Sequence, residues 1–461
     1  MLPLDVQLPD EPFAFSLQAL VEKLSSVPDL RHARGVRYPL PVVLTVAVLA
    51  KLAGHGRLRD VADWAGLRAE QLCLLLGFRR SSLPHPTTWS RIFGKALDPD
   101  TLDVVVGRFF SELCAPSIRK RRKLNTANGA NGANGANGAN GANGGRGRLV
   151  IAIDGKTLRG TIPLGSTQGV HLVAAYMPRI GVVLAQLEVQ EKANELTVTP
   201  RLLAQLDLRG VVVTGDAMFA QRNLSVQVVG ARGDYLWKVK ENQAQLLDDI
   251  KTLFEPPPPT KSEAVGFDMP QDLRRARTVN KGHGRLEERE LMVSSALKGY
   301  SDWPHLEQVF RLKCRVTDSM GQTKEAVHYG VTSLPRTVAP ACRLLEIVRE
   351  HWGIENGLHH RKDVSLGEDR SQVRLGCAPR VLATLNNVVV GLVAHQGEVN
   401  LPAAQRAFDY HLQRTMWLNW AEHEQHERHV QQLLGCASVK SLTLSNNINI
   451  NTYPVAYLHA S

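Results

Sequence analysis

The sequence predicts an α/β protein in which a mixed sheet is flanked by helices, preceded by an all-helical region and interrupted by a β-rich insertion. Three observations lead to this class. Apolar residues recur at helical spacing up to about residue 113, and from residue 149 short apolar runs alternate with helical stripes. Residues from about 273 to 334 then alternate in polarity as strands do.

Composition limits the functions to consider. The chain has 461 residues, a net charge of +11 and a pI near 9.4, which favours polyanionic partners, nucleic acid first among them. Its six cysteines include no CxxC pair, so neither a zinc knuckle nor a disulfide scaffold is expected. The N-terminus does not resemble a signal peptide, and the longest apolar run, residues 42–53, is shorter than the ~20 residues of a spanning helix. We therefore expect a cytoplasmic protein with no membrane segment.

The N-terminal region is predicted to be helical throughout. Apolar stripes at three and four spacing cover Phe15 to Leu24, Val42 to Ala53, Leu58 to Leu67, Glu70 to Leu76, Trp89 to Phe93 and Leu102 to Leu113. Pro84 and Pro86 interrupt the chain, and Thr88 is the expected N-cap of the helix that begins at Trp89.

A repeat separates this region from the rest of the chain. Residues 127 to 144 repeat the triplet Ala-Asn-Gly, with no periodic apolar face and no charge, so residues 126–147 are expected to form a flexible linker. A basic run stands directly before it: Arg119, Lys120, Arg121, Arg122 and Lys123. This run is either a solvated tail or an arm that contacts DNA phosphates.

After the linker the pattern predicts the order β-β-β-α-β-α-β-α, with the later strands parallel. The segments are strands Leu149 to Ile153, Val170 to Tyr176, Val182 to Val189, Val211 to Thr214 and Tyr235 to Val239, and helices Glu195 to Leu206, Gln221 to Val229 and Gln243 to Phe254. The insertion is expected to hold strands Arg285 to Val293, Gln308 to Val316 and Glu325 to Val331, and helices follow at Ala339 to Arg361 and Val381 to Val393.

Two carboxylates stand at the ends of predicted buried strands. Asp154 follows the predicted strand Leu149 to Ile153, and Asp216 follows the predicted strand Val211 to Thr214 and Gly215. The carboxyl ends of strands are where an open α/β sheet binds ligands. Two carboxylates at one edge can share divalent cations, and Mg²⁺ prefers such oxygen ligands. The alternative is that Asp-Gly and Gly-Asp are ordinary turn pairs.

A third acid is expected on the helix that follows the insertion. At α-helical spacing one face carries His351, Glu355, His359 and Lys362. Glu355 is therefore the first candidate for the third acid, and the nearby Glu368 is the second. The alternative for the same face is a solvated stripe. Gly353 and Gly357 lower helix stability and leave room for close approach.

These motifs resemble a known family. Ile151-Ala152-Ile153-Asp154-Gly155-Lys156-Thr157-Leu158-Arg159-Gly160, Val213 to Gln221, Lys281-Gly282-His283-Gly284-Arg285, and His351 to Asp363 with Glu368-Asp369 look like the DDE transposases of the ISAs group, the H-repeat-associated proteins. The resemblance covers about residues 15 to 395, and the N-terminal stretch looks like the transposase-associated helical domain, with motifs at Asp29-Leu30-Arg31, Arg37-Tyr38-Pro39-Leu40 and Leu58 to Ala65. Lys362 departs from the apolar residue of many relatives, and Lys240-Glu241-Asn242-Gln243 departs from the usual Lys-Gly-Asn-Gln.

The resemblance implies a ribonuclease H-like catalytic core. Together with the patterns above, it predicts domains at 1–125 (helical, recognition of DNA ends), 126–147 (linker), 148–254 (first part of the core), 255–338 (β-rich insertion), 339–396 (helical completion of the core) and 397–461 (C-terminal helix and tail). It also implies that Asp154, Asp216 and Glu355 bind two Mg²⁺ ions, with Mn²⁺ as a substitute, and catalyse DNA cleavage and strand transfer. His351, His359 and Lys362 are auxiliary candidates; Lys156, Arg159, Lys281, His283 and Arg285 are candidate DNA contacts.

Three functions share this site: a transposase acting on insertion-sequence ends, a transposase-derived DNA-binding protein without turnover, and a DNA nuclease. The presence of all three acids favours an enzyme. The expected partners are double-stranded DNA and, on that DNA, a second copy of the chain; in a bacterial cell the bound protein would be associated with the nucleoid.

Overall fold

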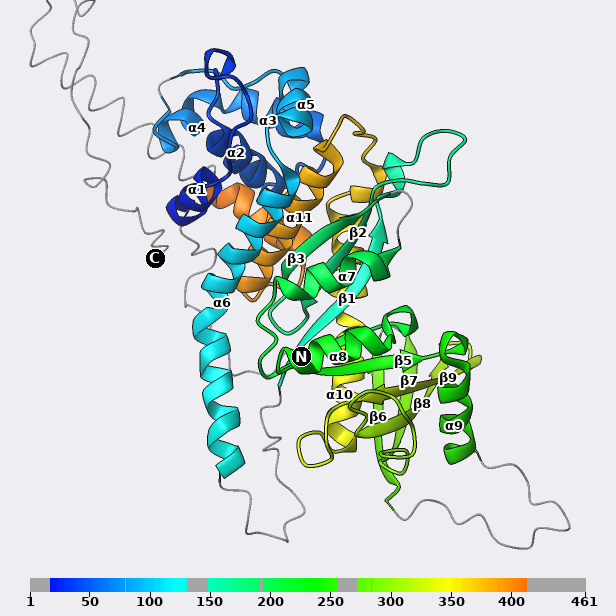
Figure 1. Ribbon diagram of the computed structural model, residues 1–461. Coiled ribbons are helices and arrows are strands. Elements are labelled where there is room, and N and C mark those ends of the chain that lie inside the picture. Colours follow the sequence, from blue (N-terminus) through cyan, green and yellow to red (C-terminus); the bar gives the residue numbers. More distant parts are fainter. Residues whose placement is uncertain are drawn as a thin grey trace, which may run out of the picture.

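The structure is a computed structural model that describes residues 17–78, 80–130, 148–190, 194–255, 272–282 and 284–412. In Figure 1 the N-terminal helices form one end of the molecule, strands β5–β9 form the other, and β1–β3 lie between them.

The described residues up to 130 form helices and short connections, as predicted. The helices are α1 (Leu17–Ser25), α2 (Leu40–Leu52), α3 (Leu58–Leu67), α4 (Ala69–Leu75), α5 (Pro86–Lys95) and α6 (Pro99–Ala130). The N-cap prediction is wrong: α5 starts earlier, and the side chain of His85, not of Thr88, accepts a hydrogen bond from the Thr87 amide. Pro86 takes the first helical position, where its missing N–H costs no hydrogen bond.

Helix α6 is longer than predicted. It passes Leu113, carries the basic run 119–123, and ends in the Ala-Asn-Gly repeat at Ala130, so residues 126–130 are helix and not linker. Arg, Lys and Leu are strong helix formers, and each added residue propagates the helix at little cost. In Figure 1 the end of α6 projects away from the other helices. The rest of the expected linker, residues 131–147, lies outside the described residues.

The central elements follow the predicted order. Strands β1 (Leu149–Thr157), β2 (His171–Met177) and β3 (Val182–Val189) precede α7 (Glu195–Ala204), β4 (Val211–Gly215), α8 (Arg222–Gly230), β5 (Asp234–Val239) and α9 (Ala244–Phe254). Strand β1 pairs in parallel with β4, and β4 with β5, whereas β2 and β3 are antiparallel additions. The predicted mixed sheet with later parallel strands is confirmed.

The strands between α9 and α10 join this same sheet. They are β6 (Arg274–Gly282), β7 (Arg285–Ser294), β8 (Gln308–Thr317) and β9 (Thr323–Thr332), of which β6 was not predicted as a separate strand. Strand β9 pairs with β5 in antiparallel fashion, giving one nine-stranded sheet in the order β3-β2-β1-β4-β5-β9-β8-β7-β6. Strand β5 therefore pairs with the parallel strand β4 on one side and with β9 of the insertion on the other.

Helices cover both faces. Alternate residues of β1 point to opposite faces, so Val150 packs with Leu344 and Val348 of α10 (Ala341–His351), whereas Ile151 belongs to the core under α7 and α8. Two π-helical turns, Glu355–His359 and Arg361–Ser365, continue from α10.

The long helix α11 (Ala378–His395) packs against β3 and against α2, α5 and α6 of the helical region. One apolar core therefore runs from the N-terminal helices into the sheet. No helix within the described ranges is long and apolar enough to cross a membrane.

Candidate active site

The two predicted aspartates lie side by side at one edge of the sheet. Ile153 of β1 and Gly215 of β4 are register partners on parallel strands, and Asp154 and Asp216 directly follow them. Both carboxylates reach solvent: the Asp216 side chain is 49% exposed and that of Asp154 is 29% exposed. The strand pairing alone thus brings together two acids that are 62 positions apart in the sequence.

Two histidines of the helical segment after β9 contact these aspartates. His351, the last residue of α10, donates a hydrogen bond from Nε2 to Oδ1 of Asp216 at 3.2 Å, and its Nδ1 lies 3.1 Å from the Thr214 hydroxyl. His359 donates from Nε2 to Oδ2 of Asp154 at 3.1 Å. The segment from residue 351 to residue 359 therefore lies across both aspartates.

Glu355 stands midway between these histidines. It begins the first π-helical turn and is exposed to solvent. The structure does not gather the three carboxylates into one cluster: within its described residues no group of three His, Cys, Asp or Glu is close enough to hold a metal ion. What it does place together is the aspartate pair and the helical segment that carries the glutamate.

Asp216 is held in its ionised form. The hydrogen bond from His351 and the ammonium of Lys238, whose Nζ lies 2.6 Å from Oδ1, keep the pKa of Asp216 well below its usual range, against the opposite effect of burial. The second oxygen of each aspartate, Oδ2 of Asp216 and Oδ1 of Asp154, accepts no hydrogen bond from the described part of the chain. Both remain available to a ligand.

A cationic and aromatic cluster adjoins Asp216 that the sequence did not reveal. Lys238 of β5 and Arg289 of β7 lie over the ring of Trp352, at 5.5 and 5.6 Å from its centre, and His328 of β9 packs edge-on against the same ring at 6.3 Å. One signal could have identified Lys238: it is a lysine between the apolar residues Trp237 and Val239 of a buried strand. The partners on β7 and β9 come from the sheet pairing, which no local pattern specifies.

Lys362 lies in a buried ion pair and not on an open face. Its side chain is only 3% exposed and pairs with Glu368 at 3.2 Å. The prediction assumed 3.6 residues per turn, whereas the π-helical turns from Glu355 onward are wider and rotate later residues off the common face.

The two candidate third acids lie in different surroundings. Glu368 is buried, and its Oε1 also accepts a hydrogen bond from Asn386 Nδ2 at 2.9 Å. A buried carboxylate that contacts a lysine and an amide of its own chain stabilises the fold. Glu355 is exposed on the segment that crosses the aspartates, so it remains the better candidate.

The predicted DNA contacts lie in different surroundings. Lys156 is mostly enclosed and pairs with Asp363 at 2.6 Å, whereas Arg159 is 80% exposed. Lys281 is exposed near the end of β6, and Arg285 at the start of β7 pairs with Glu287 at 2.6 Å. His283 lies outside the described residues, and the basic run 119–123 lies on α6, with side chains that the structure does not describe.

Fold and site together define an α/β protein with a carboxylate site at the carboxyl ends of neighbouring parallel strands. Residues 145–376 match the family model described as Transposase DDE domain, and residues 21–110 match that described as DDE_Tnp_1-associated. The first match spans half of the chain, so the chain belongs to the DDE transposases and, within them, to the H-repeat family. Its function as a member of that family is DNA transposition.

Named relatives are similar over most of their length. The chain is 27% identical over 386 residues to "Putative transposase YncI" of Escherichia coli O157:H7, covering 82% of this chain and 88% of that protein. It is 25% identical over 387 residues to "H repeat-associated putative transposase YhhI" of Escherichia coli strain K12, covering 82% and 91%. A cryo-EM structure of a piggyBac transposase synaptic complex with hairpin DNA aligns with 89% of this chain and 80% of its own, at 11% identity and a TM-score of 0.37, a value that establishes no shared fold.

Proposed function

We propose that this chain cleaves a DNA strand at the ends of an insertion sequence and joins the freed end to target DNA, using a ribonuclease H-like core. One observation carries the proposal: Asp154 and Asp216 adjoin on parallel strands, and His351 and His359 hold the Glu355 segment across them. Such adjoining carboxylates suit the binding of divalent cations.

Asp154, Asp216 and Glu355 are the residues that would hold Mg²⁺, two ions in all, with Mn²⁺ as a substitute. The fit rests on chemistry: all three offer carboxylate oxygens, and the two aspartates each keep one oxygen free of hydrogen bonds from the described residues. When bound, paired ions lower the pKa of an attacking water or hydroxyl and stabilise the leaving oxygen. Because Glu355 is exposed, its side chain can turn toward the aspartates without opening the core.

The chain's own side chains orient these acids. His351 and Lys238 hold Oδ1 of Asp216, so the free Oδ2 is presented in a fixed direction. His359 does the same for Asp154. In the first reaction water attacks the phosphorus and the transposon's 3′ oxygen leaves as a hydroxyl. In the second, that hydroxyl attacks a target phosphodiester and displaces a 3′ oxygen, with no net change in the number of phosphodiester bonds.

The remaining assignments are part of the same proposal. The helices of residues 1–125 would recognise the transposon end, residues 148–254 and 339–396 would form the catalytic core, residues 255–338 would form an insertion, and residues 397–461 a C-terminal helix and tail. Arg159, Lys281 and Arg285 would contact the DNA backbone. Two transposon ends must be brought together, so a second copy of the chain is the expected partner on DNA.

The test uses full-length protein, Mg²⁺, and labelled duplexes carrying the inverted repeats that flank its coding region. Nicking that disappears in Asp154→Ala and Asp216→Ala, and persists in the exposed neighbour His360→Ala, supports catalysis. Joined products distinguish a transposase from a nuclease. Binding without nicking by the wild-type protein would instead indicate a DNA-binding protein without turnover.

A further inference from the structure

A pocket of about 280 Å³ lies beside the candidate active site, where β5 ends between α9 and β9. Its lining includes three lysines, Lys238, Lys240 and Lys251, together with His328 and Tyr329. A water molecule takes up about 30 Å³ of liquid, so the pocket has room for a sugar-phosphate group. None of these residues was singled out by the sequence as a DNA contact.

The pocket is continuous with the aspartate pair. Lys238 lines it and also lies 2.6 Å from Oδ1 of Asp216. His328, on the neighbouring strand β9, contacts the ring of Trp352, and Trp352 directly follows the His351 that binds Asp216. A group held in the pocket would therefore sit one side chain away from the carboxylates.

The charge of the pocket favours an anion. Lys240 and Lys251 are exposed and form no ion pair with any described residue, whereas Glu241 is the one acid of the lining. Burial lowers the pKa of His328, and the positive charges of Lys238 and Lys240 lower it further. Two lysines that line the same pocket and pair with no carboxylate of the described residues are suited to a phosphate group.

The neighbouring acid Glu255 does not offset this charge. It accepts hydrogen bonds from Arg311 at 2.6 Å and from Tyr329 at 3.0 Å, so an arginine outside the lining already neutralises it. The ammonium of Lys251 lies over the ring of Tyr329, at 6.0 Å from its centre, which holds the lysine at the mouth of the pocket.

We propose that Lys240 and Lys251 bind backbone phosphates of the DNA strand that leads into the candidate active site. The proposal rests on the function proposed above and adds a site to it. These two lysines would differ in role from Lys238. Lys238 orients Asp216, whereas Lys240 and Lys251 would bind the DNA strand a short distance from the reacting phosphate.

The test measures DNA binding without metal, so that cleavage plays no part. The probe is a fluorescein-labelled 30-base-pair duplex of mixed sequence, titrated with full-length protein over a range of salt concentrations. Each phosphate contact changes the slope of log K against log salt by about 0.9. The double variant Lys240→Gln with Lys251→Gln should therefore reduce the slope by about 1.8, and Lys240→Arg with Lys251→Arg should retain the wild-type slope.

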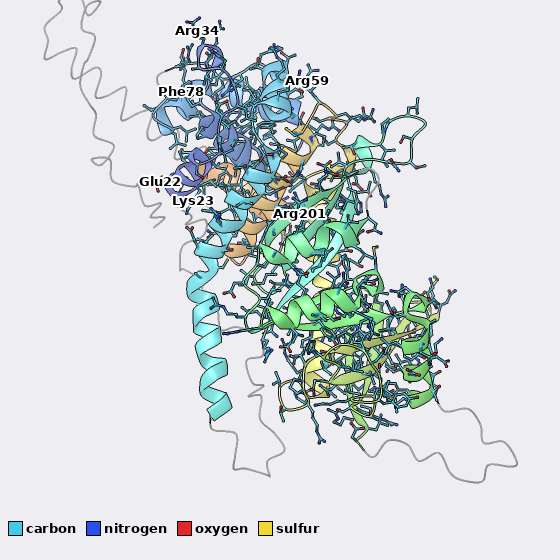
Figure 2. The ribbon with its side chains drawn as sticks, in the orientation of Figure 1. Glu22, Lys23, Arg34, Arg59, Phe78 and Arg201 are labelled. Atoms are coloured by element: carbon cyan, nitrogen blue, oxygen red, sulfur yellow. The ribbon has the colours of Figure 1, made fainter. Side chains whose placement is uncertain are left out.

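The control removes the same charge elsewhere. Arg201 on α7, labelled in Figure 2, and Arg232 after α8 are exposed residues outside the pocket lining, so Arg201→Gln with Arg232→Gln should leave the slope unchanged. The proposal is overturned if Lys240→Gln with Lys251→Gln keeps the wild-type slope. It is also overturned if this variant and the control Arg201→Gln with Arg232→Gln reduce the slope equally. If the wild-type protein binds no duplex at all, both this proposal and the function proposed above fail. If the wild-type protein binds the duplex and the pocket variant keeps its slope, only this proposal fails.

Discussion

At the scale of single residues, the site is a set of acids whose orientation depends on two histidines. The sequence was sufficient to predict that Asp154, Asp216, His351 and His359 lie close together, because strand ends and helical spacing are local patterns. It was not sufficient to place Lys362, because a widened helical turn changes which residues share a face. The partner Lys238 was missed because its role arises from the pairing of β4 with β5.

His351 should control the ionisation of Asp216. Without its hydrogen bond, the largest influence that lowers the pKa of Asp216, that pKa should rise. Hydrogen bonds to charged groups contribute roughly 1.5–3 kcal/mol, and Asp216 is half exposed, so solvent screening reduces the effect to about one pH unit. In His351→Ala the acidic limb of the pH–rate profile for DNA nicking should therefore move to higher pH by that amount. The profile of His360→Ala, an exposed neighbour, should stay in place.

Glu355 and Glu368 should respond to substitution in opposite ways. Glu355→Gln should abolish nicking and leave the melting temperature unchanged, because the side chain is exposed. Glu368→Gln removes the charge that faces buried Lys362, and breaking such a pair typically costs about 3–5 kcal/mol. Its melting temperature should fall sharply. Full nicking activity in Glu355→Gln would show that a different residue supplies the third carboxylate.

At the scale of elements, periodicity identified most helices and strands, and the failures have physical causes. Strand β6 is mostly exposed and highly charged, so it lacks the apolar run that identifies buried strands. The end of α6 was placed too early because apolar periodicity stops where the basic run begins, although helix propensity continues. The glycines beside Glu355 were interpreted correctly: a Cβ at Gly357 would lie 2.6 Å from the Tyr176 hydroxyl, and one at Gly353 2.9 Å from Pro178.

Gly107 should be required for α6 to pack on β3. A Cβ there would lie 2.2 Å from the backbone oxygen of Leu184, which has no flexible end that could move aside. Gly107→Ala should lower the melting temperature even though alanine favours helix. In Gly66→Ala on α3, where nothing lies within 4 Å, the temperature should rise, since alanine stabilises a helix by roughly 1 kcal/mol over glycine. Thermal unfolding of both variants measures the difference, and equal shifts would contradict the close approach of α6.

At the scale of the whole molecule, a series of buried polar contacts joins the N-terminal helices to the segment that follows α10. Lys51 of α2 donates to Asn386 of α11 at 2.8 Å, and Asn386 donates to Glu368, which pairs with Lys362. No sequence pattern indicated the contact between Lys51 and Asn386, because these residues are 335 positions apart. These contacts favour a single rigid arrangement of the helical region and the site.

Lys51 should make stability depend on alkaline pH. Burial lowers its pKa to about 8, whereas an unfolded lysine titrates near 10.4. Between these values the unfolded chain binds the extra proton, so stability should rise with pH across that window. Lys51→Met should remove the rise, and Lys95→Met, an exposed lysine, should retain it. Melting temperatures at pH 7.5 and pH 10 test this, and the absence of any difference between wild type and Lys51→Met would refute it.

The antiparallel pairing of β5 with β9 has a consequence for shortened forms of the chain. Residues 236–239 are bonded to residues 329–332, so cutting out the segment from 255 to 338 would leave β5 with a row of unmatched amide and carbonyl groups beside the buried Trp237. A bare sheet margin of that kind recruits strands from other molecules. Excision is therefore expected to yield aggregates, and a smaller working version of this protein would need a new cover for β5.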